Sequence, residues 1–327
     1  MNVLITGGAG YLGSILSRKL LSKGHFVRVM DQLWYGKESI EPCLKNENFQ
    51  LIEHDIRDLT ATVKAMKDVD AVIHLASIVG MPASSIEPRT SEEINYLATK
   101  NIAELCELRD IGTYIFASTC SVYGAQPDKL ITEKSPTEPL DFYANQKYMS
   151  ERAIGWLNHA PTILRFGTLF GYSPRMRFDL VINLFIAQAL NNEKITVNGG
   201  DQYRPFLHVA DAANSIIHML EHNGTGTFNV TYENMTIREV AEWVSDKTGC
   251  EIEISQENPD KRNYKVSSEK IKQFGFNTSH TLDSAFDEIK EALESKQIQD
   301  YKNFKYNNYN FLYNSKEMQK HVFLHGI

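Results

Sequence analysis

A tyrosine and a lysine near the middle of the chain have the types and the spacing needed for proton transfer. Tyr143 and Lys147 lie four positions apart, which places both on the same face of a helix. A nearby cation favours the charged form of a phenol, so the pair predicts a lowered pKa for Tyr143. An activated tyrosine can remove the proton of a hydroxyl group while hydride leaves the attached carbon. The hydroxyl-bearing residues Ser118, Thr119 and Ser121 could hydrogen-bond the reacting oxygen, or they could only cap the end of a strand.

A glycine-rich segment near the N-terminus predicts a site for a dinucleotide. Gly7, Gly10 and Gly13 follow the first predicted strand and open the first predicted helix. Glycines allow a sharp turn and a close approach to a pyrophosphate, whose charge the free N–H groups of the helix start stabilise. Asp31 ends the second predicted strand, where its carboxylate can bind the adenine ribose hydroxyls and repel a 2′-phosphate. The pattern therefore favours NAD over NADP.

The elements that must position these residues alternate along the first half of the chain. Short β-branched runs alternate with amphipathic stretches, which is typical of a parallel sheet flanked by helices. The rhythm becomes irregular after about residue 171. We therefore expect an α/β fold, a doubly wound parallel sheet of the Rossmann type with a smaller α/β C-terminal lobe. The predicted strands are 2–6, 26–30, 49–53, 71–75, 114–117 and 162–165, and the predicted helices include 12–22, 92–108 and 143–157.

Composition and charge limit the possible partners. The chain has 327 residues, of which 42% are hydrophobic, and its net charge is −7. A binder of nucleic acid normally needs a basic surplus, so nucleic acid is not an expected partner. The four cysteines show neither metal-ligand nor disulfide spacing, which predicts no metal site and suits a reducing cytoplasm. Because neither a signal peptide nor an apolar run of membrane-spanning length is evident, we expect a cytoplasmic protein without membrane contact.

Six motifs together resemble those of a known family. They are TGGAGYLG at 6–13, DQLWYG at 31–36, HDIRD at 54–58, HLAS at 74–77, FASTCSVYG at 116–124 and YANQK at 143–147. Over roughly residues 1–295 the chain resembles the extended short-chain dehydrogenase/reductase family, in its branch of NAD-dependent nucleotide-sugar epimerases and dehydratases. The resemblance implies a bound NAD that oxidises the sugar, with Tyr143 as the base, Lys147 on the nicotinamide ribose and Thr119 as the catalytic hydroxyl. It also implies that Asn95 supports the site structurally.

The resemblance extends to the cofactor contacts and the domain division. Asp55 is either an adenine contact or the cap of a helix that begins near Leu59, and His74 is interpreted as a packing residue. We expect an NAD-binding domain at 1–175 with about 205–235, and a nucleotide-sugar lobe at about 176–204 and 236–296. The implied cofactor contacts are Gly7, Gly10, Tyr11, Leu12, Asp31, Gln32, Asp55, Ile56, Leu75, Ala76 and Ser77, together with Tyr143 and Lys147.

Arginines dominate the implied substrate site. Arg204 resembles the family's nucleotide-contacting arginine, and Arg262 resembles the arginine that pairs with the diphosphate. A planar guanidinium suits both contacts, although either could be a surface arginine. Arg175 and Arg177 lie in a segment more often seen in members of surface-polysaccharide pathways, where they could guard the substrate entrance or lie on a solvated loop. The complete set is Ser118, Thr119, Ser121, Thr168, Arg175, Arg177, Arg204 and Arg262, with Thr168 standing where many members have asparagine.

The residues after Thr119 favour one reaction within the branch. The 4,6-dehydratases and UDP-glucuronate decarboxylases carry a glutamate at the position of Ser121, and GDP-fucose synthases and 3,5-epimerases carry a cysteine there. The cysteine of this chain is Cys120, one position earlier, so chemistry confined to C4 is favoured. We expect a nucleotide-sugar 4-epimerase, similar to UDP-glucose 4-epimerase, in polysaccharide precursor biosynthesis. The alternatives are a GDP-heptose-like 4-dehydrogenase, suggested by the arginine segment and residues 259–264, and a non-catalytic sensor of dinucleotide or nucleotide-sugar.

Two further features concern assembly. The predicted helices 92–108 and 143–157 suggest a homodimer, in keeping with the fold family. Residues 297–327 form a tail rich in asparagine and aromatic residues. Aromatic residues this dense are rarely left in water, so we expect the tail to pack on the protein, bind a partner or cover the active site.

Overall fold

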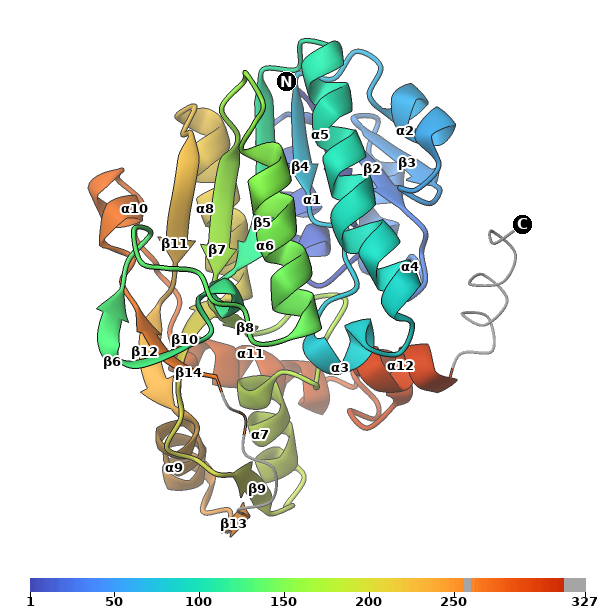
Figure 1. The fold of residues 1–327 in the computed structure, drawn as a ribbon. Helices are drawn as coiled ribbons and strands as arrows, with labels where there is room; N and C mark the ends of the chain where they lie inside the picture. Colours follow the sequence, from blue (N-terminus) through green and yellow to red (C-terminus); the bar gives the residue numbers. More distant parts are fainter. Residues whose placement is uncertain (256–259, 261, 315–327) are drawn as a thin grey trace.

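A parallel sheet of seven strands forms the centre of the fold in the computed structural model, which describes residues 1–255, 260 and 262–314 (Figure 1). The strand order is β11-β7-β5-β4-β1-β2-β3. All six predicted strands and the doubly wound sheet are confirmed, and the edge strand β11 adds to them. The bounds are β1 (Asn2–Thr6), β2 (Phe26–Asp31), β3 (Phe49–Glu53), β4 (Ala71–His74), β5 (Thr113–Thr119), β7 (Thr162–Phe166) and β11 (Gly226–Val230).

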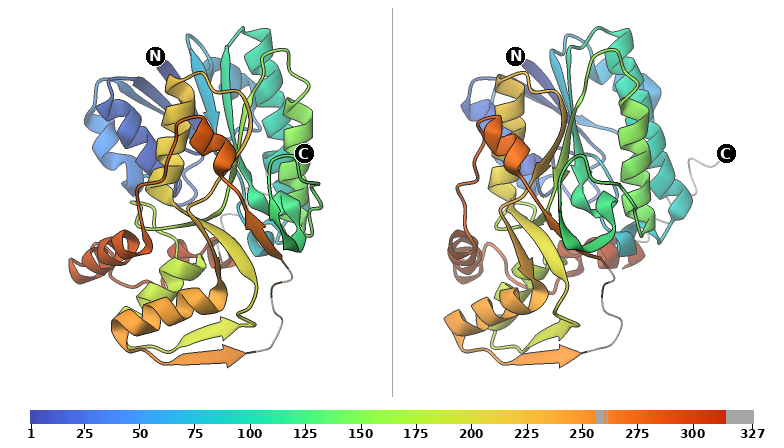
Figure 2. Two further views of the ribbon diagram at one scale, coloured as in Figure 1. Left: turned by 90° about the vertical axis from the view of Figure 1, so that its left-hand side faces the viewer. Right: turned by 60° about the vertical axis from the view of Figure 1, so that its left-hand side comes forward.

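Helices cover both faces of this sheet (Figures 1 and 2). One face carries α1 (Gly13–Ser22), η1 (Glu38–Lys45) and α8 (Val209–Glu221). The other carries α2 (Leu59–Ala65), α5 (Ala98–Leu108) and α6 (Phe142–Ile154). The short α3 (Met81–Ser84), α4 (Pro88–Glu92) and η2 (Glu93–Leu97) lead into α5.

Burial explains why the central strands are apolar on both sides. Val3, Leu4 and Ile5 of β1 are fully buried, although successive side chains of a strand point to opposite faces. A parallel sheet with helices on both faces has no solvated side, so its strands read as continuous apolar runs. In α1, Leu16 and Leu20 lie one helical turn apart and are fully buried, which docks that helix on the sheet.

Three smaller sheets lie around the carboxyl ends of the central strands (Figure 1). Helices α7 (Val181–Leu190) and α9 (Ile237–Thr248) pack on each other and on β9, α10 (Glu269–Gln273) packs on β11, and α11 (Leu282–Glu294) packs on α7. The sheets are β12 (Glu233–Thr236), β10 (Tyr203–His208) and β8 (Thr168–Phe170); β13 (Ile252–Ser255) and β9 (Ile195–Asn198); and β14 (Asn263–Val266) and β6 (Ala125–Ile131).

The chain ends its described part in η4 (Phe304–Tyr306) and α12 (Asn308–Asn314), beside α3 (Figure 1). Tyr301 and Leu312 are buried there, with exposed fractions of 7% and 3%. The rest of the predicted tail, 315–327, lies outside the described residues. The described part of the tail therefore packs against the protein.

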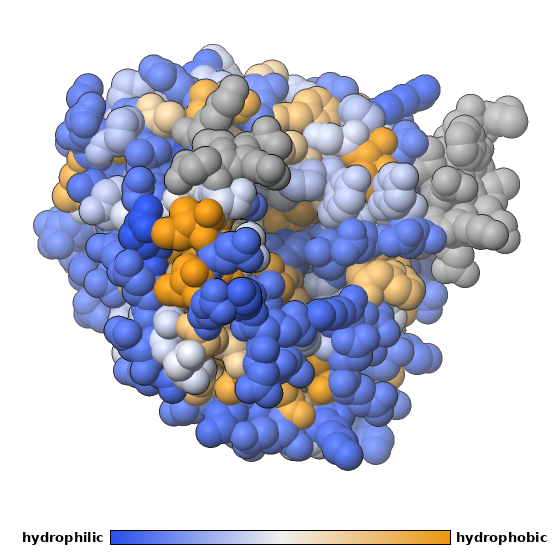
Figure 3. Space-filling model, turned by 90° about the horizontal axis from the view of Figure 1, so that it is seen from below, coloured by the Kyte–Doolittle hydropathy of each residue, from blue (hydrophilic) through white to orange (hydrophobic). Residues whose placement is uncertain are grey.

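None of the described helices is both long and apolar enough to cross a membrane. Seen from below, the surface is mostly hydrophilic, with apolar groups gathered in small areas (Figure 3).

A buried ion pair joins α6 to the central sheet. Arg165 of β7 donates to Glu151 of α6 from Nη2 at 2.6 Å and from Nε at 3.0 Å. Both side chains are less than 10% exposed, at 9% and 6%. Arg165 Nη1 also donates to the Tyr123 hydroxyl at 2.8 Å, from η3 (Cys120–Tyr123). The pair therefore ties the helix that carries Tyr143 to the strands beneath it.

Removal of the Glu151 carboxylate is expected to destabilise the fold strongly. Glu151→Ala leaves the Arg165 guanidinium buried without its partner, and breaking a buried pair in this way costs about 3–5 kcal/mol. Denaturant unfolding followed by circular dichroism measures the loss. The exposed pair of Lys100 and Glu104, with side chains 48% and 54% exposed, provides the control, since Glu104→Ala should cost less than about 1 kcal/mol. Equal losses in the two variants would contradict the role of the buried pair.

Candidate active site

The glycine turn between β1 and α1 is packed too tightly for larger residues. Gly7 has a φ of +74°, and a Cβ there would lie 2.7 Å from the backbone nitrogen of Ala76. A Cβ on Gly13 would overlap the carbonyl oxygen of Gly7. The turn itself therefore requires these two glycines. A Cβ on Gly10 would have one close neighbour, the Gly7 oxygen at 3.2 Å, so the packing around Gly10 leaves more room.

The start of α1 provides backbone N–H donors next to the space around Gly10. Leu12 is the N-cap, and its side chain makes no capping hydrogen bond. The N–H groups of a first helical turn have no partner within the helix, and they bind phosphate groups well. Tyr11 is buried and donates its hydroxyl to the Gly171 carbonyl at 2.5 Å, and burial raises the pKa of this phenol. The turn thus fits the pyrophosphate of NAD.

Asp31 lies at the end of β2, where the sequence predicts the ribose contact. Its Oδ2 accepts a hydrogen bond from the Ala9 amide at 2.9 Å, and its Oδ1 accepts one from the Leu33 amide at 2.8 Å. Burial raises the pKa of Asp31, whereas these two bonds and the charge of Arg175 lower it. Because each carboxylate oxygen can accept more than one hydrogen bond, both oxygens can still accept from a ribose.

A pocket of about 690 Å³ opens next to the end of β3. Asp55 accepts hydrogen bonds from the Arg57 amide at 2.8 Å and from its Nη2 at 2.7 Å. Asp58 caps α2, since it accepts from the Ala61 amide at 3.0 Å, so the capping alternative for Asp55 is wrong. The neighbouring Ile56 is buried. The pocket is lined by Gln32, Glu53, His54, Asp55, Arg57, Asp58, Glu93, Leu97, Ala98 and Asn101.

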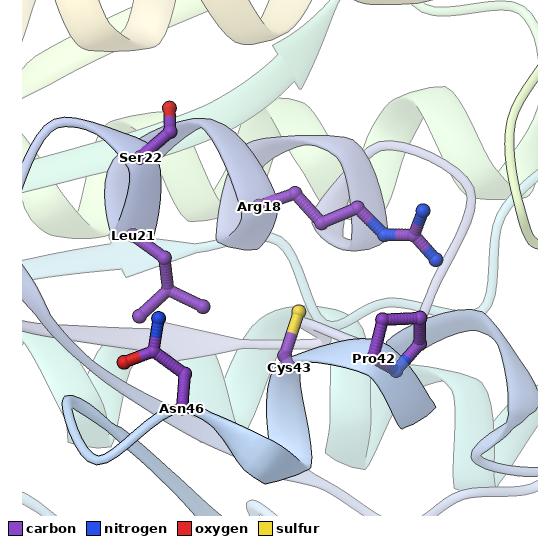
Figure 4. A pocket seen from close by; sticks show the side chains of 6 residues that line it. All are labelled: Arg18, Leu21, Ser22, Pro42, Cys43 and Asn46. Carbon is purple, nitrogen blue, oxygen red and sulfur yellow. The ribbon is translucent and has the colours of Figure 1, made fainter.

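A smaller pocket of about 260 Å³ lies between α1 and η1 (Figure 4). It includes none of the predicted site residues. Its lining residues are Arg18, Leu21, Ser22, Pro42, Cys43 and Asn46.

The end of β4 is connected to α6 through one asparagine. Asn95 Oδ1 accepts from the Ser77 hydroxyl at 2.8 Å and from the Ile78 amide at 2.7 Å. Its Nδ2 donates to Gln146 Oε1 of α6 at 2.8 Å. These bonds fix the segment that contains the predicted cofactor contacts Leu75, Ala76 and Ser77. The contacts match the supporting role expected of Asn95.

His74, at the end of β4, is a packing residue. Its ring nitrogens lie 2.6 Å from the Thr6 hydroxyl and 2.9 Å from the Thr99 hydroxyl, and its ring stacks on Phe116. Burial lowers the pKa of His74 to about 3. The imidazole is therefore neutral near pH 7, and both of its nitrogens have a partner.

Tyr143 and Lys147 lie on the buried face of α6, at the carboxyl end of β5. Lys147 donates from Nζ to the Ala117 carbonyl at 3.0 Å, and its ammonium lies 4.8 Å from the centre of the Phe116 ring and 6.0 Å from that of Tyr143. Burial lowers the pKa of Lys147 to about 7. The helix thus brings the predicted pair together.

The expectation that Lys147 lowers the pKa of Tyr143 is wrong for this structure. Burial raises the pKa of Tyr143 well above its usual range, and the charges that lower it are those of Arg177 and Arg262. The spacing along the helix reveals only the neighbour Lys147, whereas burial and two arginines from distant segments dominate the environment of the phenol.

The three hydroxyl groups after β5 have different partners. Thr119 Oγ1 accepts from the Ser121 amide at 3.1 Å and caps η3, while its side chain stays partly exposed. Ser121 Oγ lies 3.4 Å from Arg262 Nη1 and 3.5 Å from the Tyr264 hydroxyl. Ser118 instead donates to Glu151 within the buried ion pair. The prediction of Ser118 as a substrate contact therefore does not match its placement, because its hydroxyl is used to hold α6.

The two predicted substrate arginines meet at one carboxylate. Arg204 Nη2 lies 2.7 Å and Arg262 Nη2 lies 2.5 Å from Asp260 Oδ2. The two guanidinium groups hold the pKa of Asp260 well below its usual range, against the opposing effect of burial. Arg262 Nη1 also lies 3.8 Å from Asp141 Oδ2 at the start of α6. Arg204, Arg262 and Ser121, which are far apart in sequence, therefore form one cluster.

Arg175 and Arg177 are both buried, so the solvated-loop interpretation is wrong. Arg177 donates from Nε and Nη2 to Asp179 at 2.9 Å each. Arg175 lies with its guanidinium carbon 3.7 Å from the centre of the Tyr35 ring, in the loop that follows Asp31. Thr168 lies in β8, opposite Phe206 in the strand that also carries Arg204.

Three residues that were not among the predicted site residues complete these clusters. Asp260 bridges the two arginines, Tyr264 lies within reach of Ser121, and Tyr35 stacks on Arg175. The acidic residue two positions before Arg262 was a usable signal, since it favours an ion pair. Nothing in the local sequence indicates the contact of Tyr35 with Arg175, 140 positions apart.

Comparison with known proteins agrees with this arrangement. The sequence pattern of the NAD dependent epimerase/dehydratase family matches residues 3–231. UDP-glucuronic acid decarboxylase 1 of Xenopus tropicalis is 30% identical over 286 residues, covering 82% of this chain and 66% of its own length. UDP-glucose 4-epimerase of Lactobacillus helveticus is 28% identical over 282 residues, covering 77% of this chain and 83% of its own.

A solved structure extends the comparison to three dimensions. UDP-glucose 4-epimerase of Thermus thermophilus, in complex with NAD, superposes with a TM-score of 0.78 at 25% identity, over 90% of this chain and 100% of its own. The chain therefore belongs to the NAD dependent epimerase/dehydratase family, within the extended short-chain dehydrogenases/reductases. It is an NAD-dependent enzyme of the nucleotide-sugar epimerase/dehydratase type.

Because Lys147 is buried, we expect the free energy of unfolding to depend on pH. The unfolded chain holds the Lys147 proton up to about pH 10.5, its ordinary pKa, while the folded chain loses it near 7. The free energy of unfolding of the wild type, relative to Lys147→Met, should therefore rise between pH 7 and 9, by about 2 kcal/mol. Below about pH 7 the difference should level off. Denaturant unfolding at pH 6 to 9 measures it, and a difference independent of pH would contradict the burial of a titrating ammonium.

Proposed function

We propose that this protein is a nucleotide-sugar 4-epimerase, similar to UDP-glucose 4-epimerase, that acts at C4 of its sugar. The observation that carries the proposal is the group at the end of β5. Thr119 is partly exposed, Tyr143 and Lys147 lie on the helix beside it, and position 121 holds a serine rather than a carboxylic acid. Without an acid at that position, the site lacks the group that a 4,6-dehydratase needs to eliminate water. Chemistry at C4 alone suits these residues.

The roles of the residues follow from their surroundings. Bound NAD supplies the hydride acceptor and donor. The Tyr143 phenolate takes the proton of the C4 hydroxyl and, as the phenol, later returns it to the C4 oxygen, Thr119 hydrogen-bonds the reacting oxygen, and Lys147 holds the nicotinamide ribose. Burial raises the pKa of Tyr143 and so disfavours the phenolate that the proton transfer needs. The positive charges of Arg177 and Arg262 act in the opposite direction and favour the phenolate.

The arginine cluster supports a nucleotide diphosphate as the ligand. Asp260 pairs with both Arg204 and Arg262, so the two guanidinium groups lie close enough to share one anion. A diphosphate is also an anion with neighbouring oxygens, and it carries more negative charge than a carboxylate. We propose that residues 176–204 and 236–296 form the lobe that binds the nucleotide sugar, and that 1–175 with 205–235 bind NAD.

A 4-dehydrogenase is the second candidate. The arginine segment that suggests it is bonded into the fold, through Arg177 to Asp179 and through Arg175 to Asn308, so it is a structural feature and not a solvated loop. A dehydrogenase would stop at the 4-keto sugar and pass its reducing equivalents to an external oxidant. A sensor without activity is disfavoured by the preserved arrangement of Tyr143, Lys147 and Thr119.

The test is a panel of UDP-, GDP-, CDP- and dTDP-hexoses incubated with the NAD-loaded protein, with NMR of the products. We expect the C4 epimer from at least one of them. Tyr143→Phe should slow its formation by about 100-fold or more, because the general base is lost. Tyr148→Phe, on the same helix, is the matched control and should keep the wild-type rate.

Three outcomes distinguish the candidates. No C4 isomer from any nucleotide sugar would contradict the epimerase. A 4-keto product with matching near-ultraviolet absorbance of reduced cofactor would favour the dehydrogenase. An unchanged cellular activity in Tyr143→Phe would favour the sensor.

We also propose a homodimer formed through α5 and α6, which lie side by side (Figure 1). Both helices carry or adjoin exposed apolar side chains, with Leu97 44% and Met149 40% exposed. Such residues in solvent favour a partner surface.

Light scattering tests the dimer, whose mass should be about twice 37.2 kDa. Met149→Arg places a charge in the interface and is expected to shift the mass toward the monomer. Ile254→Arg, at a similarly apolar position 43% exposed on β13, should leave it unchanged. A monomeric wild type would contradict the proposal.

A further inference from the structure

The C-terminal segment lies against the arginine segment that follows β8. The Phe178 amide donates to the Tyr306 carbonyl at 2.8 Å, and the Phe178 ring packs edge-on against those of Tyr301 and Tyr306, at 5.6 Å and 5.7 Å. The Asn308 amide donates to Asp179 Oδ2 at 3.2 Å. These bonds hold the start of α12 in a defined place beside residues 175–179.

The same segment continues onto the domain that carries the glycine turn. Leu312 is 3% exposed and belongs to the apolar cluster that includes Ile78 and Ala83, just after β4. The Phe311 ring lies 4.6 Å from the Tyr35 ring, in the loop that follows Asp31. In Figure 1, α12 lies beside α3, far in sequence from its neighbours. The segment therefore reaches the predicted cofactor site.

The C-terminal segment holds Arg175 next to the predicted cofactor site. Its side chain is 7% exposed, Nη2 donates to Asn308 Oδ1 at 2.6 Å, and the guanidinium stacks on Tyr35. Its charge also acts on Asp31. Within the described residues, Nε of Arg175 is buried and has no hydrogen-bond partner.

A buried donor without an acceptor is costly, so it indicates an acceptor supplied from outside the described chain. The indole nitrogen of Trp34, in the same loop as Tyr35, is likewise buried and unpartnered among the described residues. Arg175 lies two positions from Ser173, whose hydroxyl donates to the Tyr11 carbonyl at 2.6 Å within the glycine turn. The charge of Arg175 acts on Asp31, and its neighbour Ser173 is bonded to the glycine turn, so a positive charge there suits the diphosphate of the adenosine half of NAD.

We propose that Arg175 binds the diphosphate of NAD and that residues 303–314, through Asn308 and Phe311, are part of the cofactor site because they hold Arg175 and Tyr35 in place. Arg175 contacts the cofactor, and Asn308 and Phe311 are positioning residues. This inference rests on NAD as the cofactor and not on the choice of sugar reaction.

The test compares the binding of NAD, ADP and adenosine to the full chain by calorimetry. Arg175→Gln should weaken NAD and ADP by about tenfold or more and leave adenosine within twofold, because only the diphosphate is lost as a partner. Asn308→Ala and Phe311→Ala should weaken NAD and ADP by a smaller factor in the same pattern. Tyr313→Ala, on α12 and 66% exposed, is the matched control and should bind as the wild type does.

The outcomes distinguish the proposed role of Arg175 from the cofactor assignment and from the proposed reaction. If Arg175→Gln does not fold, by circular dichroism, Asn308→Ala decides through its ratio of ADP to adenosine affinity. Unchanged ADP affinity in both variants would overturn the proposal, as would an equal loss of ADP and adenosine, which would indicate a merely structural role. Loss of epimerase activity with normal NAD binding would count against the proposed reaction, whereas a wild type that binds neither NAD nor ADP would overturn the cofactor assignment itself.

Discussion

The buried ion pair of Glu151 and Arg165 is the interaction on which the site depends. Two charges inside a protein are costly unless they are paired and hydrogen-bonded, so this pair admits one position of α6 on the sheet. Ser118 and Tyr123 add hydrogen bonds to the same two side chains. Tyr143 and Lys147 lie on the same helix, and this contact helps to hold them above the end of β5.

The carboxyl edge of the sheet then gathers segments that are remote in sequence. The glycine turn, the loop after β2 and the end of β4 meet there because parallel strands end at one edge. Arg204 and Arg262 approach from the smaller sheets and share Asp260. The C-terminal helix α12 also contributes a contact, since its Asn308 accepts a hydrogen bond from Arg175. The arrangement brings Arg177 and Arg262, from two remote segments, close enough for their charges to act on Tyr143.

The fold and the glycine turn could be predicted from local sequence patterns. The surroundings of several site residues could not, because they depend on contacts between distant segments. The six predicted strands of the central sheet and the glycine turn follow from periodicity and from steric limits that act between neighbouring residues, whereas β6 was not predicted. The pKa of Tyr143 could not be predicted from the spacing to Lys147, because burial and arginines from two distant segments dominate it. Ser118 and Arg175 were assigned by motif to the substrate, but tertiary partners, Glu151 and Tyr35, decide where their side chains lie.

The central claim is that hydride leaves C4 of a nucleotide sugar and goes to bound NAD. The most direct measurement uses nucleotide hexoses deuterated at C4, with mass spectrometry of the cofactor and of the sugar after the protein is denatured. The account predicts deuterium in the reduced cofactor or back at C4 of the sugar, and none lost to water. Deuterium released into the solvent, with an unlabelled cofactor, would contradict it, because that result means proton abstraction at carbon instead of hydride transfer.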